Sequence, residues 1–181
     1  MTTWKIDAAH SEVNFKVKHM LVSTVRGNFD KFEATIQTNK EDFSDAVIKF
    51  EADVNTINTN NVQRDTHLKS ADFFDAENHP KMTFVSSDVK KISDHEMQVN
   101  GKLTVRGVTK EVTLEVIYNG TVSGFGDTTV AGFEVHGKLN RFDYGLQWNA
   151  LTEAGGVVVS NEVKIEILAE FNQVDEAVKA A

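Results

Sequence analysis

The residues best suited to chemistry lie in residues 58–84 (NTNNVQRDTHLKSADFFDAENHPKMTF), where Arg64, Asp65 and His67 stand close together. An arginine binds carboxylates and phosphates, and a neighbouring carboxylate and imidazole can transfer a proton. At the opening of a helix, the same residue types commonly form a cap or a structural salt bridge. The sequence leaves two roles open for these three residues: they hold a helix in place, or they contact a polar group of a ligand.

Other catalytic and metal-binding patterns find little support. The chain has six histidines, which are His10, His19, His67, His79, His95 and His136. None are paired at HxH or HExxH spacing, and cysteine is absent, which removes disulfides, thiolate catalysis and cysteine zinc sites. Asp7, His10 and Ser11 superficially resemble a nucleophilic triad, but adjacent strand residues point to opposite faces and a nucleophile elbow is lacking. We therefore predict neither a catalytic residue nor a metal site.

The elements that must position these residues are β-strands, because apolar and polar residues alternate along most of the chain. The alternation defines eight strands, at residues 13–17, 32–36, 46–54, 82–84, 97–105, 112–118, 131–139 and 163–171. We predict turns at Arg106-Gly107 and at residues 93–95, and a further turn at Asn119-Gly120, where the alternation stops. Gly101 is predicted to stay within a strand, because the apolar phase runs unbroken across it.

Eight strands with one apolar face each need a second apolar surface, and only one helical segment is present to supply it. Closing the sheet on itself buries every apolar face and removes both edges. We therefore predict an all-β fold: an eight-stranded antiparallel β-barrel with a short helical insertion, about residues 59–79, near its mouth. A sandwich of two sheets is the alternative, and alternation does not distinguish a filled barrel from a hollow one.

Within the insertion, Thr59 or Asn60 is expected to cap a first short helix. Ser70 is expected to cap a second helix that ends before Pro80. The apolar residues predicted to face the barrel interior, as solid core or as the wall of a cavity, are Phe15, Val17, Phe29, Phe32, Ile36, Phe50, Phe73, Phe74, Phe84, Leu103, Val116, Phe133 and Ile165.

Length and composition limit the organisation of the chain and its partners. With 181 residues and neither a linker nor a repeat, we predict one domain over residues 1–172 and a tail over residues 173–181 that is helical or disordered. The net charge of −8 and the lack of basic runs argue against a nucleic-acid partner. No window approaches the roughly 20 apolar residues of a transmembrane helix. The opening MTTWKID resembles no signal peptide, so we expect a cytoplasmic location, or a periplasmic one if a leader has been removed.

Four blocks of sequence, in this order, resemble the YceI-like family, the bacterial polyisoprenoid-binding proteins of lipocalin-like fold. The blocks are WKIDAAHSEVNFKVKHMLVSTVRGNF, residues 58–84, VNGKLTVRGVTKEVTLEV and LNRFDYGL, and the resemblance covers residues 4–171. Its most specific parts are RD-x-HL and LTVRGVTK. The resemblance implies a lipocalin-like barrel whose long pore holds an isoprenoid or similar lipid chain, with the inserted helices near its opening, often in a homodimer.

The family blocks also contain polar residues. His10, Ser11, His19, Arg64, Asp65, His67 and Arg141 match these blocks. The resemblance implies that some of them contact a quinone, phenol, amide or phosphate headgroup near the rim, unless they only tie loops together. Tyr144 and Trp148 either line the mouth with them or cover the barrel end.

The function expected from these features is non-enzymatic binding, storage or transport of a polyisoprenoid or similar long-chain lipid, such as an isoprenoid quinone, phenol, fatty acid or fatty amide. Such a tail needs a long dry cavity, because its binding free energy comes from apolar area removed from water. No cofactor other than this lipid is expected. Two alternatives are an enzyme that uses His67, Asp65 or His10 as general acid or base, and a stress-related interaction protein whose filled barrel is only a scaffold.

Overall fold

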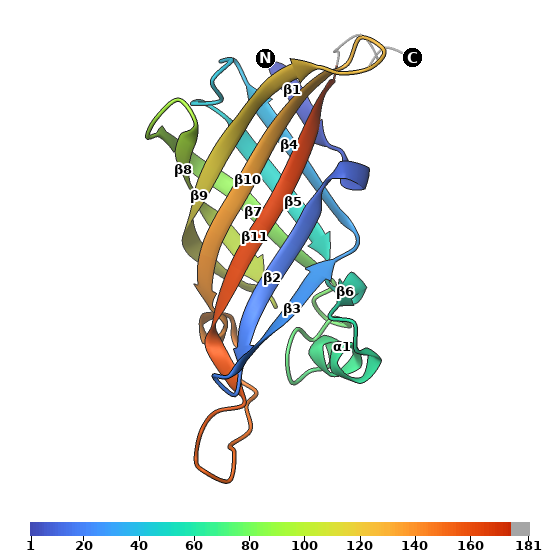
Figure 1. Ribbon diagram of the computed structural model, residues 1–181, viewed down its shortest axis with the longest axis vertical. Coiled ribbons are helices and arrows are strands. Elements are labelled where there is room, and N and C mark those ends of the chain that lie inside the picture. Colours follow the sequence, from blue (N-terminus) through green and yellow to red (C-terminus); the bar gives the residue numbers. More distant parts are fainter. Residues whose placement is uncertain (175–181) are drawn as a thin grey trace.

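The structure, a computed structural model that describes residues 1–174, is an antiparallel β-barrel (Figure 1). Its strands are β1 (Thr2–Ile6), β2 (Glu12–His19), β3 (Ser23–Phe29), β4 (Phe32–Thr38), β5 (Val47–Asp53), β6 (Ile57–Asn58), β7 (Lys81–Lys91), β8 (Glu96–Val105), β9 (Val108–Ser123), β10 (Thr129–Asn140) and β11 (Val159–Val174). The α-helix of this part of the chain is α1 (Val62–Lys69), and short 3-10 turns are η1 (Ala8–His10), η2 (Val54–Thr56) and η3 (Arg141–Tyr144). Within residues 1–174, no helix has the length and apolar character needed to cross a membrane.

Eight strands close the barrel, as predicted. Their order is β1, β4, β5, β7, β8, β9, β10, β11, and β11 pairs back onto β1. One of the eight predicted strands is not among the eight that close the barrel. The predicted strand at residues 13–17 is β2, which lies outside the closed ring, and β1 is the eighth strand of the ring instead. The long strand β11 explains the difference: Phe171 pairs with Ile6 of β1, whereas Val163 pairs with Val17 of β2. The short strands β1, β3 and β6 show too little alternation to be recognised from the sequence.

The first strands of the chain are interrupted midway along the barrel. The turn η1 separates β1 from β2, residues 30–31 separate β3 from β4, and η2 separates β5 from β6. The sheet order ends at β6, whose other edge pairs with no strand of residues 1–174. Helix α1 begins soon after β6 and lies beside it (Figure 1). One end of the barrel is therefore completed by a helix and loops rather than by strand pairing.

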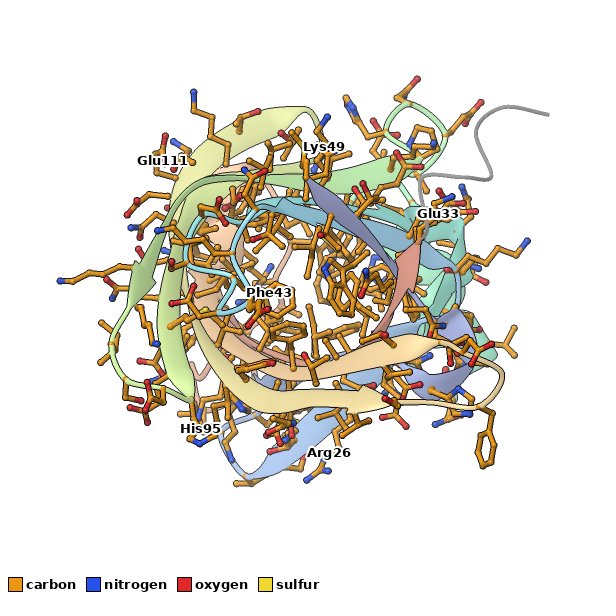
Figure 2. All side chains as sticks on the ribbon, turned by 90° about the horizontal axis from the view of Figure 1, so that it is seen from above. Arg26, Glu33, Phe43, Lys49, His95 and Glu111 are labelled. Atoms are coloured by element: carbon orange, nitrogen blue, oxygen red, sulfur yellow. The ribbon has the colours of Figure 1, made fainter. Side chains whose placement is uncertain are left out.

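The opposite end of the barrel is filled by Phe43, which lies in the loop between β4 and β5. Phe43 is 2% exposed, and its ring centroid lies 5.3 Å from that of Trp4, 5.4 Å from Tyr118 and 5.1 Å from Phe133. Figure 2 looks down on this end and shows Phe43 near the middle of the barrel. Edge and tilted contacts of this kind stabilise an aromatic cluster beyond its buried area. We refer to this end as the closed end.

Asp45 holds the loop that carries Phe43. Its Oδ1 accepts hydrogen bonds from the Thr38 hydroxyl (2.5 Å) and from the backbone N–H of Asn39 (3.2 Å) and Lys40 (3.3 Å). These bonds hold a backbone in which Phe43 has a φ of 58°, a left-handed conformation that is unfavourable for a bulky residue. The loop conformation is thus stabilised by one carboxylate and by the burial of one aromatic ring.

Most predicted turns are confirmed, and one is wrong. Arg106-Gly107 joins β8 to β9, residues 93–95 lie between β7 and β8, and Gly101 lies within β8. Asn119-Gly120 is not a turn, because β9 continues through it to Ser123. An irregularity in the pairing, opposite Gly132 and Phe133 of β10, absorbs the change of phase that the sequence shows there.

The insertion contains one helix instead of the predicted two. Asn61, rather than Thr59 or Asn60, caps α1 by accepting a hydrogen bond from the backbone N–H of Arg64 (2.9 Å). Ser70 ends α1 instead of starting a second helix, because its hydroxyl and backbone N–H both donate to the carbonyl of His67. Residues 71–78 then form turns and no helix. Of the predicted tail, residues 173–174 belong to β11, and the remainder lies outside the described residues.

Candidate binding cavity

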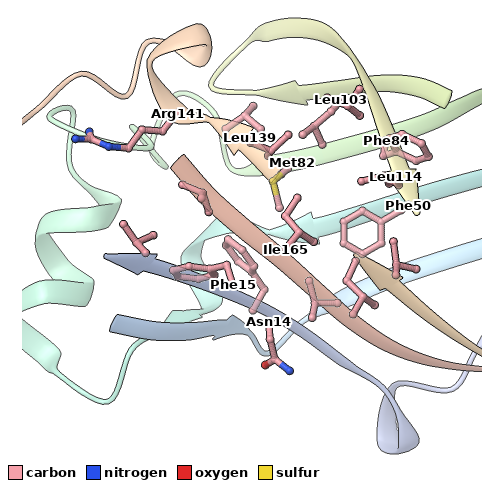
Figure 3. Close-up of a pocket in the computed structure, with 18 of the residues that line it drawn as sticks. Asn14, Phe15, Phe50, Met82, Phe84, Leu103, Leu114, Leu139, Arg141 and Ile165 are labelled. Carbon is pink, nitrogen blue, oxygen red and sulfur yellow. The ribbon is translucent and has the colours of Figure 1, made fainter. Parts of the chain in front are cut away.

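A cavity of about 600 Å³ runs inside the barrel from Phe43 at the closed end to α1 and η3 at the other end, which we call the mouth. This volume lies within the range of small-molecule binding sites. Figure 3 shows apolar side chains of several strands around it, including Phe15, Phe50 and Ile165, with Arg141 at the same end as α1. The interior of the barrel is therefore hollow.

The cavity wall contains nearly all the apolar residues that the sequence placed inside. They are Phe15, Val17, Phe29, Ile36, Phe50, Phe73, Phe74, Phe84, Leu103, Val116, Phe133 and Ile165. Phe32 is the exception: it does not line the cavity but packs against a second apolar cluster that includes Val13 and Ala52. It stands where the chain breaks between β3 and β4, and there the alternation no longer determines which side chains reach the cavity.

Three wall side chains of β2 and β11 are incompletely buried. Phe15, Val17 and Ile165 point to the inner face, yet each is only partly buried, because each borders the cavity. At the closed end, Phe133 and Val99 are almost fully buried. The aromatic cluster around Phe43 limits the depth of the cavity.

Arg141 is buried at the mouth and binds backbone rather than a carboxylate. It is 5% exposed, its Nε donates to the carbonyl of Ser160 (2.9 Å), and its Nη1 donates to the carbonyls of Leu146 (2.6 Å) and Trp148 (2.8 Å). Its Nη2 donates to the carbonyl of Val159 (3.2 Å). Burial lowers the pKa of this guanidinium from its ordinary value. Arg141 lines the cavity and at the same time fixes the loop between η3 and β11.

Arg64 and Asp65 are joined through Thr59. Asp65 Oδ1 accepts hydrogen bonds from the backbone N–H (2.9 Å) and the hydroxyl (2.5 Å) of Thr59. Arg64 donates from Nε to the Thr59 hydroxyl oxygen (2.7 Å) and from Nη2 to the Thr59 carbonyl (2.8 Å). Arg64 and Thr59 line the cavity, whereas Asp65 does not. Asp65 therefore has the structural role, and Arg64 combines a structural contact with a place in the wall.

His67 connects α1 to two other segments at the mouth. Its Nε2 lies 2.9 Å from Asp72 Oδ2, and its ring meets the rings of Trp148 and Phe73 edge to face, with centroids 4.7 Å and 5.0 Å away. His67, Phe73 and Trp148 all line the cavity. The adjacent Phe74 also lines the cavity, so both phenylalanines of the insertion contribute to the cavity wall.

His10 and Ser11 lie outside the cavity. His10 Nδ1 is 3.0 Å from Asp7 Oδ2, a hydrogen bond that raises the pKa of the imidazole and lowers that of the carboxyl group. The Ser11 hydroxyl accepts a hydrogen bond from the backbone N–H of Glu170 (2.9 Å). Asp7, His10 and Glu170 bring possible metal-ligand atoms within 4.8 Å of one another at the surface, and the hydrogen bond between Asp7 and His10 accounts for part of this arrangement. These residues hold η1 against β11.

His19 and Tyr144 both line the cavity. Tyr144 is 3% exposed, and its hydroxyl has no hydrogen-bond partner within residues 1–174. Burial raises the pKa of Tyr144 to about 12, so the hydroxyl keeps its proton at neutral pH. Among the wall residues that escape sequence reasoning are Asn14 and Lys18, which the alternation assigns to the outside. Another is Phe43, whose only signal is a single aromatic residue in a polar loop.

Comparisons with known proteins agree with this architecture. The family model of the YceI-like domain matches residues 4–171. A UPF0312 protein of Staphylococcus aureus (strain MSSA476) is 41% identical over 175 residues, which cover 95% of this chain and 98% of that protein. The crystal structure of a Campylobacter jejuni YCEI protein, 31% identical, superposes with a TM-score of 0.75 and covers 93% of this chain and 96% of its own.

More distant structures share the fold alone. BcnA of Burkholderia cenocepacia is 22% identical and superposes with a TM-score of 0.79 over 91% of this chain and 98% of its own. A domain from Saccharophagus degradans is 18% identical, with a TM-score of 0.65 over 94% of this chain and 98% of its own. The family match over residues 4–171 and the 41% identity to a full-length relative go further than the fold, and they show that this chain belongs to the YceI-like family.

Proposed function

We propose that this protein binds a polyisoprenoid or similar long-chain lipid in its barrel cavity and stores or transports it without chemical change. The observation that carries the proposal is the cavity of about 600 Å³, whose wall is apolar along its length, ends at Phe43 and has its charged groups near the mouth. Each Å² of apolar surface that leaves water contributes about 25 cal/mol, so a long hydrocarbon tail binds in such a space without specific polar contacts.

The comparisons support the same class of ligand. The structurally similar domain from Saccharophagus degradans is described as a polyisoprenoid binding domain. An isoprenoid quinone or phenol, a fatty acid and a fatty amide all present a tail that an apolar tunnel accepts. The tail would extend toward Phe43, and the headgroup would remain at the mouth.

The placement of the candidate acid and base residues favours a carrier over an enzyme. Of Asp65, His67 and His10, only His67 lines the cavity, and its Nε2 is engaged by Asp72. Asp65 is engaged by Thr59, and His10 lies on the outside of the barrel. General acid or base catalysis by Asp65 or His10 is therefore disfavoured, because neither side chain reaches the cavity.

Native mass spectrometry of the purified protein, with solvent extraction and lipid analysis, tests the proposal. A matched pair of variants on β11 makes the test specific: Ile165 lines the cavity, and the adjacent Lys164 points to the outer face. We expect wild-type protein and Lys164→Trp to carry or take up a long-chain lipid, and Ile165→Trp to lose it because the indole occupies the cavity. A wild-type protein that never carries or takes up such a lipid would contradict the proposal, as would equal lipid content in Ile165→Trp.

A further inference from the structure

The charged residues of the cavity wall are all of one sign. The basic residues that line it are Lys18, His19, Arg64, His67 and Arg141. None of the aspartates and glutamates in residues 1–174 lines it. Yet the chain as a whole is acidic, with 27 Asp and Glu against 19 Lys and Arg. The absence of carboxylates from the wall therefore does not follow from the composition.

Within residues 1–174, Lys18, Arg64 and Arg141 of the wall lack carboxylate partners, whereas His67 lies beside Asp72. No ion pair formed within residues 1–174 involves Lys18, Arg64 or Arg141. The buried guanidinium of Arg141 donates only to backbone carbonyls, and Arg64 donates from Nε and Nη2 to Thr59. Nη1 of Arg64 has no hydrogen-bond partner among the described residues, which leaves two N–H donors available. Arg141 is buried, whereas Lys18 and Arg64 are exposed, so these two cations are accessible to an anion that enters the mouth.

These groups share one position along the cavity. Lys18 and His19 end β2, Arg64 and His67 belong to α1, and Arg141 begins η3. All three elements lie at the mouth (Figure 1), whereas the closed end around Phe43 is apolar and aromatic. The cavity is therefore apolar at its closed end and positively charged at its mouth. This arrangement complements a long-chain acid, which has an apolar tail and an anionic headgroup.

We propose that the ligand carries an anionic headgroup, a carboxylate or a phosphate, held at the mouth by Arg64 and Lys18 in the field of the buried Arg141. This inference rests on the proposed function and specifies the chemistry of its ligand. Guanidinium and ammonium groups form charge-assisted hydrogen bonds with both anions, and the planar guanidinium can bind either one through two oxygens.

Matched probes that differ only in their headgroup test the inference. Palmitic acid is compared with hexadecanamide and hexadecanol, and geranylgeranyl phosphate with geranylgeraniol, by displacement of a fluorescent lipid at low salt. We expect the anionic member of at least one pair to bind about tenfold more tightly than its neutral partners, since charge-assisted bonds are roughly twice as strong as neutral ones. The pair that shows the preference distinguishes a carboxylate ligand from a phosphate ligand.

Two double variants distinguish the effect of the charges at the mouth on probe affinity from the effect of the net charge of the protein. Lys18→Gln with Arg64→Gln should abolish the preference while binding of the neutral probes is kept. The control is Lys49→Gln with Lys102→Gln, two exposed lysines on β5 and β8 that do not line the cavity. Equal affinity for anionic and neutral probes overturns the inference and leaves the proposed function intact. If none of the probes binds, the proposed function itself fails.

A second inference rests on a different feature, the β2–β3 hairpin of residues 13–29. Its tip consists of Met20, Leu21 and Val22, whose exposed fractions are 45%, 72% and 84%. Residues 13–29 contain Lys16, Lys18, His19 and Arg26, and the nearest carboxylates in sequence, Glu12 and Asp30, lie at the end of the hairpin away from the tip. Lys16 pairs with Glu166, and Arg26 lies directly opposite Lys16 on β3. Lys18 and His19, nearer the tip, form no ion pair with a carboxylate of residues 1–174. An exposed apolar tip on a basic stem is the pattern of segments that bind anionic membrane surfaces.

The tip is part of the cavity mouth. The backbone N–H of Met20 donates to the carbonyl of Val158 (2.9 Å), and both Val158 and His19 line the cavity. Leu151, 75% exposed, lies on the neighbouring loop, where it pairs with Val157. Apolar side chains thus project into solvent from two segments around the opening.

We infer that this hairpin docks the cavity mouth onto an anionic lipid bilayer, with Leu21 and Val22 in the interface and Lys18 at the headgroups. Docking in this orientation would let a lipid pass between bilayer and barrel without crossing water. The protein as a whole carries a net charge of −8, so an anionic surface repels it. It would approach such a surface through a locally positive face such as this hairpin.

Flotation with phosphatidylcholine vesicles, with and without phosphatidylglycerol, tests the docking. Leu21→Asp with Val22→Asp should reduce binding to the anionic vesicles about tenfold, because two charges replace the apolar tip. The control is Val122→Asp with Phe125→Asp, which alters exposed apolar residues, 65% and 100% exposed, in the β9–β10 hairpin at the closed end. The inference is overturned if phosphatidylglycerol does not increase vesicle binding. It is also overturned if the two double variants reduce vesicle binding by the same amount. A hairpin variant that only converts a dimer to a monomer in sedimentation would show that a second copy of the chain covers this face instead.

Discussion

The ring of Phe43 meets the ring of Phe133 edge to face, with centroids 5.1 Å apart and an interplanar angle of 90°. Phe133 belongs to the wall of the barrel, in β10, whereas Phe43 comes from a loop that folds into the barrel end. This contact closes the cavity at one end. The depth of the cavity, and so the length of tail that it accepts, depends on a loop rather than on the strands.

Replacing Phe43 with alanine should both destabilise the protein and deepen the cavity. Loss of a buried phenylalanine costs about 3–5 kcal/mol of unfolding free energy, which urea denaturation would measure. Longer lipid probes should gain affinity relative to shorter ones. Phe125→Ala, at a fully exposed position, is the control and should change neither quantity. An unchanged preference for chain length would show that Phe43 does not limit the cavity.

Acid should release the loop that carries Phe43. Hydrogen bonding, first from the Thr38 hydroxyl, lowers the pKa of Asp45 from 3.8 to about 2. Because the pKa is lower in the folded than in the unfolded state, Asp45 stabilises the fold above about pH 4, and this contribution is lost as the pH falls toward about 2. Melting temperatures across this range should therefore fall less steeply for Asp45→Asn than for the wild type. Parallel curves would rule out this role.

Gly101 should not tolerate a side chain. A Cβ atom there would lie 2.4 Å from Phe84 Cζ and 2.5 Å from the backbone oxygen of Val85, and the backbone cannot move aside without disturbing the pairing of β7 with β8. We expect Gly101→Ala to lower the unfolding free energy by about 1–3 kcal/mol, as overpacking usually does. Gly132→Ala is a matched strand control, because its nearest contact would be an ordinary 3.5 Å to Asn119 Cβ. Equal stability of the two variants would contradict this account.

Substitutions of Asp65 and of His67 should have different effects, the first mainly on stability and the second mainly on lipid binding. Asp65→Ala leaves the buried Thr59 without its acceptor, so the melting temperature should fall, by an amount corresponding to about 1–3 kcal/mol, with little change in lipid affinity. His67→Ala removes part of the cavity wall and its contact with Trp148, so lipid retention should change more than the melting temperature. Thermal melting and lipid extraction on the same preparations measure both. The opposite pattern would reverse the two roles.

The sequence by itself determined the strand class, the closed barrel and most of the inner face. These follow from a local rule, because side chains alternate between the two faces of a strand. The alternation alone therefore assigns Val17, Leu103 and Ile165 to the inner face, without information on the strands beside them. The sequence blocks likewise identified the family before any coordinates were considered. Where the chain breaks its alternation, as at Phe32 and Asn119, the same rules led to errors.

Only the tertiary structure decided that the barrel is hollow, that Phe43 closes one end and that the charges of the wall are all positive. The volume left inside a barrel depends on how side chains from opposite strands meet across it, which no local pattern contains. Asp65 and His67 stand two residues apart, yet one turns toward Thr59 and the other toward the cavity, because the contacts that α1 makes with β6 and with the loop of Trp148 orient the helix. Their different roles arise from packing between distant segments.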